Sequence, residues 1–190
     1  DMMGGDFGPD VTVKGLDHAL KKLDNVHANL LGNKELINKV LSKYPSLSSK
    51  VNIFHTEKFV PMDAKPIDAL RRIGKDSSMW MSIDSCAKNN SDVILSAGNT
   101  GALMALSKII LRTIEGIERP AITALWPNPE GESVVLDLGA NIDVSSNQLV
   151  QFGIMGYAYA VCVLKKEKPK IAILNIGHED TKGSNDLQEA

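Results

Sequence analysis

The stretch "DVILSAGNTGALMALSKIILR", residues 92–112, decides the fold class of this chain. Its first six residues form a short apolar run that is typical of a buried strand, and the rest has the apolar content of a helix. The turn between them, rich in glycine and asparagine, lies where a strand of an α/β sheet gives way to its helix. The stretch therefore predicts a strand over residues 92–97 and a helix over residues 98–112.

The same alternation continues on both sides of this unit. Predicted strands cover residues 26–32, 51–55, 92–97, 121–127, 133–139 and 170–177. Predicted helices cover residues 9–23, 33–44, 66–72, 76–90, 98–112, 147–164 and 184–190. The link between the fourth and fifth strands is too short for a crossover helix, so these two are expected to pair as an antiparallel hairpin.

This order predicts an α/β fold with a mostly parallel sheet and helices on both faces. A length of 190 residues favours one domain. The sequence begins where a first strand would end and stops inside a helix. We therefore interpret residues 1–190 as a single α/β domain that forms the N-terminal part of a longer one.

Composition and charge exclude several classes of protein. The chain is 43% hydrophobic and 23% charged, which are ordinary globular values. A net charge of -2 gives no electrostatic basis for binding nucleic acid. Cys86 and Cys162 lie in no CxxC pattern, so we expect neither a zinc site nor a redox pair, and a reduced cytoplasmic location fits. No apolar run approaches the roughly 20 residues of a membrane span, and no signal peptide is evident.

Four loops rich in glycine and asparagine follow predicted strands, at residues 1–9, 96–102, 136–143 and 174–184. In sheets of this kind, ligands bind at the carboxyl ends of the strands. Glycine lets a backbone approach a ligand closely, and a helix start adds free N–H groups. Any α/β protein needs glycine at single turns of this kind. Four such loops together favour a phosphate-binding site at one rim of the sheet.

Several familiar motifs are missing from these loops. There is no GxxxxGK[ST] of a P-loop hydrolase, no GxGxxG of a dinucleotide enzyme and no GxSxG of a hydrolase. His178 is the one histidine in a candidate loop, and a catalytic base and an exposed bystander remain open for it. The cluster "HED" at 178–180 is not expected to converge on a metal, so we expect no metal ion and no cofactor.

Seven motifs together resemble those of the bacterial phosphate acyltransferases of the PlsX family, in the same order along nearly the whole chain. They are "DMMGGDFGP" (1–9), "KDSSM" (75–79), "SAGNTGALMAL" (96–106), "EGIERPA" (115–121), "VVLDLGAN" (134–141), "QLVQFGIMG" (148–156) and "NIGHEDTKG" (175–183). The family's C-terminal part, with a "DGFTGN"-type motif, is absent from this sequence. The combination is far more specific than any one glycine loop.

The resemblance implies an enzyme that moves a long-chain acyl group from acyl carrier protein to inorganic phosphate. The acyl phosphate product then feeds phospholipid synthesis. It also implies a Rossmann-like three-layer α/β/α sandwich, similar in shape to phosphotransacetylase and isopropylmalate dehydrogenase. The family is cytoplasmic and homodimeric, and works beside a PlsY-type membrane glycerol-3-phosphate acyltransferase.

Candidate site residues follow from this chemistry and from the four loops. Backbone N–H groups around Gly98, Asn99, Thr100 and Gly101 are expected to hold phosphate or the oxyanion. Asn141 and Asn175 are expected to orient the thioester, and Lys182 or His178 to protonate the leaving thiolate. Asp6 and Asp137 either accept a hydrogen bond from phosphate or anchor their loops. Further glycines would allow close approach of substrate: Gly4, Gly5, Gly139 and Gly177.

Two other classes of function stay open on sequence alone. The first is a short-chain acyl-phosphate transferase that uses coenzyme A, on the same scaffold. The second is a non-catalytic module that binds acyl carrier protein without turnover. A dehydrogenase is a distant third, because the dinucleotide fingerprint is missing.

Overall fold

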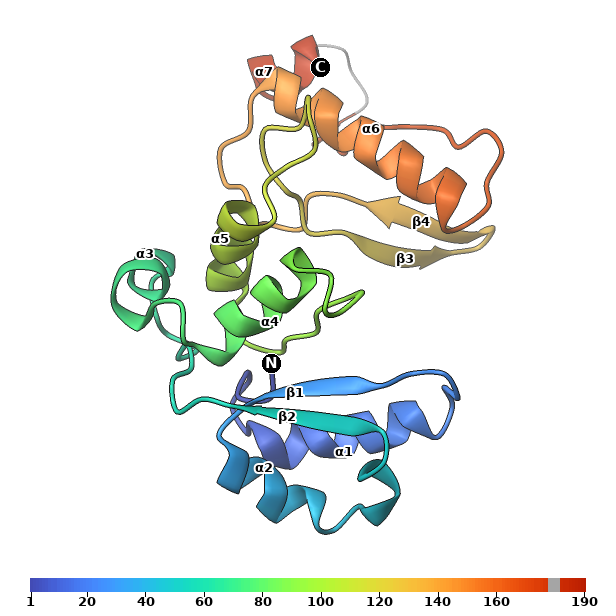
Figure 1. The fold of residues 1–190 in the computed structure, drawn as a ribbon. Helices are drawn as coiled ribbons and strands as arrows, with labels where there is room; N and C mark the ends of the chain where they lie inside the picture. The colour runs from blue at the N-terminus through green and yellow to red at the C-terminus, as the bar shows by residue number, and fades with distance from the viewer. Residues whose placement is uncertain (178–181) are drawn as a thin grey trace. The chain divides into compact units, whose positions relative to one another are not determined.

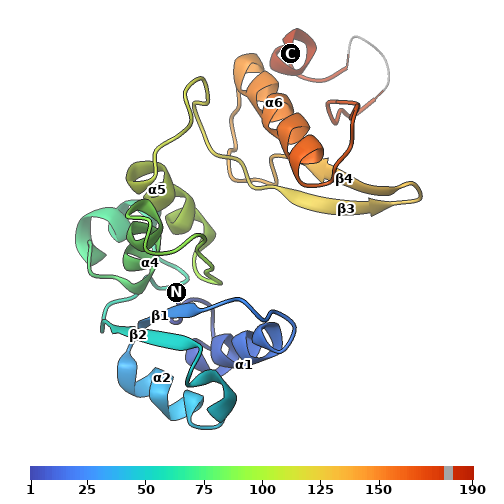
Figure 2. The ribbon, with the colours of Figure 1, turned by 45° about the vertical axis from the view of Figure 1, so that its right-hand side comes forward.

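The computed structural model describes residues 1–177 and 182–190. It divides into two compact units, Asp1–Arg112 and Thr113–Ala190, each of which has its own pair of strands. Figure 1 shows the elements of both units, and Figure 2 shows them from a second direction. The chain is a mixed α/β protein, and the prediction that all 190 residues form one domain stays a prediction.

The first unit is built on a parallel strand pair, β1 (Ala28–Gly32) and β2 (Val51–His55). Leu30 pairs with Ile53 in the centre of this register. Helices α1 (Pro9–Leu20) and α2 (Lys34–Leu41) cover one face of the pair, as Figure 1 shows, with the short helix η1 (Pro45–Leu47) beside α1. The crossover from β1 through α2 to β2 is the parallel connection that the sequence predicted.

Three further helices and one short turn complete the first unit. α3 (Pro66–Asp68) continues into the π-helical turn η2 (Ala69–Ile73), and α4 (Ser78–Ala87) and α5 (Thr100–Ile110) follow. α4 lies against β1 on the face opposite α1 and α2, and α5 packs on α4 (Figure 1). The Ser77 hydroxyl accepts a hydrogen bond from the Trp80 N–H and so caps the start of α4.

Two apolar clusters hold the first unit together. One fills the space between α1, α2 and the strand pair, and the other lies among α3, η2, α4 and α5. The buried members of the first are Met2, Val13, Leu20, Leu30, Ile37, Val40 and Leu47. Those of the second are Val60, Ala69, Met79, Ile83, Ala102 and Leu106. Because Met2 belongs to the first cluster, the opening loop is packed into the core rather than trailing from it.

The second unit combines an antiparallel hairpin with one long helix. β3 (Ala124–Asn128) pairs with β4 (Gly131–Val135), as the short link between the predicted strands had indicated. α6 (Ser146–Cys162) packs against β4, and α7 (Asn185–Glu189) contacts α6 (Figure 2). Ser145 and Gln148 form a capping box, in which each side chain bonds the other's backbone at the start of α6.

Two predicted strands are wrong in this structure, so the mostly parallel three-layer sheet is not seen in the described residues. Residues 92–97 and 170–177 have no strand conformation. A strand needs a neighbouring backbone. Within the described part, the backbone of residues 92–97 accepts bonds only from the Asp1 terminal nitrogen, at Leu95, and from the Cys86 thiol, at Asp92. Neither 92–97 nor 170–177 has a ladder of backbone–backbone bonds among the described residues.

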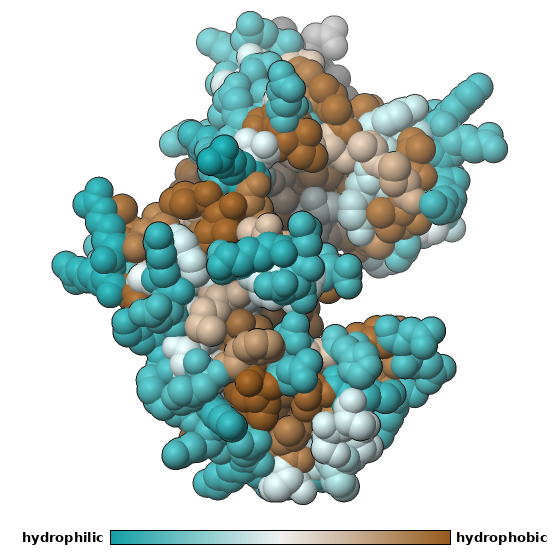
Figure 3. Space-filling model, in the orientation of Figure 1, coloured by the Kyte–Doolittle hydropathy of each residue, from teal (hydrophilic) through white to brown (hydrophobic). Residues whose placement is uncertain are grey.

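These two segments leave apolar side chains uncovered. Leu95 is 86% exposed and Leu174 is 84% exposed, although both lie in apolar runs that are typical of buried strands. Figure 3 shows apolar side chains reaching the surface in several places on one face of the molecule. Both segments carry apolar side chains, but the described residues offer neither of them a neighbouring strand.

Helix positions agree with the sequence prediction to within about three residues at each end. The helix expected over residues 9–23 ends at Leu20, because the N–H groups of Lys22 and Leu23 both turn back to the Ala19 carbonyl. In the part of the chain that the structure describes, no helix combines the length and apolarity that crossing a bilayer requires.

Asp17 is the basis of a prediction on stability. Its buried carboxylate accepts a hydrogen bond from Lys21 at 2.6 Å and one from Ser46 at 3.3 Å, which joins α1 to η1. The Lys21 bond, more than any other cause, holds the pKa of Asp17 below its ordinary value of 3.8. A lowered carboxyl pKa contributes stability that is fully present above the ordinary value and is lost as pH falls through the folded-state pKa.

We therefore expect Asp17→Asn to lower the melting temperature at about pH 6, with a gap to the original protein that narrows below pH 3.8. Thermal denaturation across this pH range measures the gap. Asp24→Asn, at an exposed position after the same helix, is the matched control and should leave the melting temperature unchanged. A gap that stays constant down to the acid limit would contradict the role of the ionised carboxylate.

Candidate functional site

The opening loop and the loop before α5 lie against each other in the first unit. The Ser96 hydroxyl donates to the Asp1 carboxylate at 2.7 Å and accepts from the Gly98 N–H at 3.1 Å. The Met2 N–H donates to the Leu31 carbonyl at 3.0 Å, which ties the opening loop to β1. Two of the four predicted loops are thus brought together, although 95 residues separate Asp1 from Ser96.

Glycine is required where these loops touch. A Cβ on Gly4 would lie 2.6 Å from the Gly98 backbone nitrogen, and a Cβ on Gly98 would lie 2.8 Å from the Met79 Cε. Gly5 has φ +83, a conformation that L side chains rarely adopt. The sequence analysis expected these glycines to let a ligand come close. In the structure, they let the backbones of two loops come close to each other.

Asn99 holds the start of α5 in place. Its side-chain oxygen accepts from the Ala102 N–H at 2.9 Å and caps the helix. Its side-chain nitrogen donates to the carbonyls of Met62 and Ala64 at 2.7 and 2.8 Å. Both ends of this amide are therefore occupied by the protein itself, and the Asn99 side chain fixes the position of the helix start.

The N–H groups of Thr100 and Gly101 remain free at this helix start. Neither has an acceptor within the described residues, and both residues are exposed. The first N–H groups of a helix lack intrahelical partners and carry a partial positive charge, which suits a phosphate or an oxyanion. Asp6, in the opening loop, is also exposed, and its carboxylate has no partner among the described residues.

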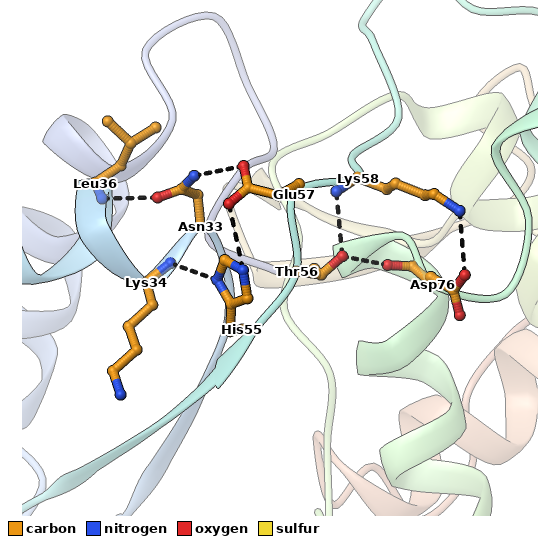
Figure 4. Close-up of polar contacts among 8 residues, drawn as sticks. All are labelled: Asn33, Lys34, Leu36, His55, Thr56, Glu57, Lys58 and Asp76. Atoms are coloured by element: carbon orange, nitrogen blue, oxygen red, sulfur yellow. Dashed lines mark hydrogen bonds and ion pairs between the residues drawn. The ribbon is translucent and has the colours of Figure 1, made fainter.

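A polar cluster at the carboxyl ends of β1 and β2 was not predicted. Figure 4 shows it. His55 accepts from the Lys34 N–H at 3.2 Å through Nδ1 and lies 3.3 Å from the Glu57 carboxylate through Nε2. Asn33 donates to the same carboxylate at 2.7 Å. Both ring nitrogens of His55 are engaged, so this histidine has no free nitrogen for a substrate.

The same cluster positions α4. The Thr56 hydroxyl donates to the Asp76 carbonyl at 2.5 Å and accepts from the Lys58 N–H at 3.1 Å, while the Lys58 ammonium lies 3.1 Å from the Asp76 carboxylate (Figure 4). Asp76 precedes α4, whose Met79 contacts Gly98. Several residues of this cluster lie at or directly after the ends of two predicted strands, 26–32 and 51–55. That position is the sequence signal that could have pointed to the cluster.

The third predicted loop lies in the second unit, and its carboxylate has a structural task. Asp137 accepts from the Ile122 N–H and from the Asn141 N–H, each at 2.7 Å. The Asn141 side chain donates to the Pro120 carbonyl at 3.0 Å and to Asp137 at 3.1 Å. The sequence left two roles open for Asp137, a hydrogen bond to phosphate and an anchor for its loop. The bonds seen in the structure are those of a loop anchor. Gly139 is exposed, with φ +87.

The fourth loop is described in part. Asn175 accepts from the Ile176 N–H at 2.8 Å and donates to the Lys182 carbonyl at 3.0 Å, so its side chain closes the loop on itself. The Lys182 side chain is exposed, and Gly177 is partly buried. His178 lies outside the described residues. That all four loops form one rim stays a prediction, because the third and fourth belong to the second unit.

Glu118 is a second residue that sequence reasoning did not select. Its carboxylate accepts hydrogen bonds from three amide side chains of α6, and these bonds hold its pKa below the ordinary value, that from Gln148 contributing most. The described residues contain no group of His, Cys, Asp and Glu that could hold a metal ion. Cys162 is exposed and Cys86 is partly buried; both are free thiols.

Comparison with known proteins identifies the relatives of this sequence. A family described as "Fatty acid synthesis protein" matches residues 1–190. Proteins named "Phosphate acyltransferase" from Paramagnetospirillum magneticum and Methylocella silvestris are each 46% identical over 190 residues, and one from Rhizobium rhizogenes is 47% identical over 191. All of this chain is covered, against 54%, 52% and 55% of those proteins, so the chain spans about half of their length.

The contact between the two loops of the first unit can be tested at Gly4. We expect Gly4→Ala to lower the free energy of unfolding by about 1–3 kcal/mol, because the Cβ would force a backbone atom to move. Chemical denaturation measures this change.

Gly15→Ala is the matched control. Gly15 lies inside α1, and a methyl group added there would meet no atom within 4 Å, so alanine should raise stability by about 0.5–1 kcal/mol. Equal effects at the two glycines would contradict the close contact of Gly4 with Gly98.

Proposed function

The chain belongs to the fatty acid synthesis protein family, and from this premise we propose that the full-length protein is a phosphate acyltransferase. Its substrates are inorganic phosphate and a long-chain acyl group carried as a thioester on acyl carrier protein. A phosphate oxygen attacks the thioester carbonyl carbon, the carbon–sulfur bond breaks, and the departing thiolate takes a proton. The product is an acyl phosphate for phospholipid synthesis.

One observation carries the proposal for the chemistry: the start of α5 offers free N–H groups on a backbone that is held from two sides. Ser96 and Gly4 fix the loop before the helix, and the Asn99 side chain fixes the helix start itself. Phosphate is already a nucleophile, so no activated serine or cysteine is needed. Holding the two reactants in position supplies about 7–11 kcal/mol in well-oriented reactions.

The remaining residues have distinct proposed roles. Thr100 and Gly101 donate their N–H groups to phosphate or to the oxyanion, for which a preorganised donor contributes about 3–4 kcal/mol. Asp6 accepts a hydrogen bond from the protonated form of phosphate. Asn141 and Asn175 hold the conformation of their loops, because their side-chain amides bond nearby backbone carbonyls. The thioester lies on these loops. Lys182 or His178 protonates the thiolate.

The finer statements on fold and assembly also belong to this proposal. The complete protein is a Rossmann-like α/β/α sandwich in which residues 1–190 form one domain with the remaining chain. It is a cytoplasmic homodimer, without cofactor or metal, and hands its product to a PlsY-type membrane glycerol-3-phosphate acyltransferase. The lengths of the phosphate acyltransferase relatives support a domain larger than residues 1–190.

The reaction itself is tested with the full-length protein, palmitoyl-acyl carrier protein and inorganic phosphate, without nucleotide or added metal. We expect acyl phosphate and free carrier thiol to appear together, in amounts that depend on phosphate. Replacing the carrier substrate by acetyl-coenzyme A should stop the reaction. Carrier binding without release would contradict the transferase and support a binding module, and turnover of acetyl-coenzyme A would support a short-chain enzyme.

The start of α5 is tested by Asn99→Ala and Thr100→Ala in the same assay. Asn99→Ala removes the cap and the tether to Met62 and Ala64, so the N–H groups shift and the rate should fall about 10- to 100-fold. Thr100→Ala removes only an exposed side chain.

We expect Thr100→Ala to retain the rate of acyl transfer, because the proposal assigns the backbone N–H to phosphate. A loss of that rate would show that the Thr100 hydroxyl also takes part. Asn33→Ala, which removes the cap of α2, is the control for loss of a helix cap as such. A rate for Asn99→Ala equal to that of Asn33→Ala would contradict the assignment. Circular dichroism establishes that each variant is folded.

A further inference from the structure

The segment Glu118–Ile122 of the second unit is fixed along its length. The Glu118 N–H donates to the Gln151 side chain at 2.8 Å, the Pro120 carbonyl accepts from Asn141 at 3.0 Å, and the Ile122 N–H donates to Asp137 at 2.7 Å. Its two ends are thus held by α6 and by the loop 136–141. This segment overlaps the motif "EGIERPA", to which the proposed reaction has so far given no task.

The Glu118 carboxylate is occupied by uncharged donors. Asn147 and Gln148 donate to it at 2.9 Å each, and Gln151 donates at 3.3 Å. Gln148 and Gln151 are buried, with 7% of their surface exposed, so these contacts are built into the packing of α6. Hydrogen bonds to an ionised carboxylate are among the strong ones, and here they clamp the segment without an ion pair.

Within residues 1–177 and 182–190, this arrangement leaves Arg119 without a bonded partner. It is exposed, and no acceptor or carboxylate bonds its guanidinium among the described residues. The adjacent Glu118 carboxylate is taken by the three amides, and the charge of Arg119 is only the last of the causes that lower the Glu118 pKa. Because the backbone at Arg119 is already fixed, binding a ligand orders its side chain without having to order the backbone as well.

We propose that Arg119 binds a phosphate oxyanion of the substrates. The amides of α6 clamp Glu118, so among the described residues Arg119 forms no ion pair with its neighbour. A guanidinium presents a planar fork of donors that matches phosphate in bidentate fashion. Asp137 fixes both the Ile122 N–H and the Asn141 N–H, so Arg119 belongs to the same rigid piece as the predicted loop 136–143. The inference rests on the proposed acyltransferase reaction and adds a binding residue to it.

Two sources of the oxyanion share this chemistry. One is free inorganic phosphate, the attacking substrate, and the other is the phosphodiester of the pantetheine arm on the acyl carrier protein. They are distinguished by which Michaelis constant changes when Arg119 is replaced.

The experiment measures steady-state kinetics of the full-length protein with Arg119→Met and Arg119→Lys. Loss of a hydrogen-bonded charged pair predicts a rise of about 10- to 100-fold in the KM of the substrate that bears the oxyanion, with Arg119→Met. Arg119→Lys keeps the charge but not the fork, so its KM should lie between. A rise in the KM of inorganic phosphate assigns the first source, and a rise in that of acyl carrier protein assigns the second.

Arg71→Met and Arg71→Lys are the matched controls, because Arg71 is an exposed arginine on η2 in the first unit. They should leave both constants unchanged. Unchanged constants for Arg119→Met, or a fall in kcat alone, would overturn the inference while the acyltransferase reaction stands.

Direct binding keeps the two proposals separate. Calorimetric titration of full-length protein with inorganic phosphate, and with 4′-phosphopantetheine against pantetheine, needs no turnover. Weaker binding of one phosphate-bearing probe to Arg119→Met supports the inference even if the acyl transfer assay fails. Equal binding of all probes to both proteins overturns it, whatever the assay gives.

Discussion

The contact between the backbones of Gly4 and Gly98 is the constraint on which the arrangement of the first unit depends. Because no side chain fits between them, the opening loop and the start of α5 approach closely enough for Ser96 to bond Asp1. The Met2 N–H carries the connection on to β1. A helix start, a loop and a strand are thereby held together by one close backbone approach, one side-chain bond and one backbone bond.

The second unit reaches similar rigidity by a different means. Asp137 and Glu118 each gather hydrogen bonds from neutral donors, backbone N–H groups for Asp137 and side-chain amides for Glu118. Gln148 also accepts from the Ser145 N–H, so one side chain joins the start of α6 to Glu118. Carboxylates bound in this way hold segments together without an ion pair among the described residues.

Sequence patterns predicted the parts of the fold that depend on local chemistry. Asn33 and Ser77 cap two helices that begin close to where the sequence predicted, because their side chains satisfy N–H groups a few residues away. The hairpin of β3 and β4 followed from the length of its link. Residues 92–97 and 170–177 were expected to be strands, and this was wrong, because an apolar run describes a side-chain pattern while a strand also needs a neighbouring backbone.

The candidate site, like the fold, was predictable where it depends on local chemistry and not where it depends on contacts between distant residues. Glycine-rich loops revealed where the chain turns, but not that Asn99 would bond the protein through both ends of its amide. Nor did they reveal that Arg119 would have no bonded partner in the described part of the chain. Those facts depend on contacts across tens of residues, such as Gln151 with Glu118. The spacing of residues in the sequence does not predict such contacts. The motif at 115–121 therefore gave no indication of a role for Arg119.

The Arg119 guanidinium and the N–H groups at the start of α5 have different tasks in the proposed reaction. Binding that acts equally on substrate and transition state lowers KM without raising kcat, whereas donors aimed at charge that develops during attack raise kcat. A guanidinium that grips a phosphate oxyanion before and during attack belongs to the first kind. The N–H groups at the start of α5 belong to the second where they meet the oxyanion of the tetrahedral intermediate, because the neutral thioester carbonyl draws on them far less. A reaction whose nucleophile arrives already charged depends on positioned donors more than on a base. In the proposed reaction, the glycine contact would position the N–H groups of α5, and the clamp of Glu118 would position the backbone of Arg119.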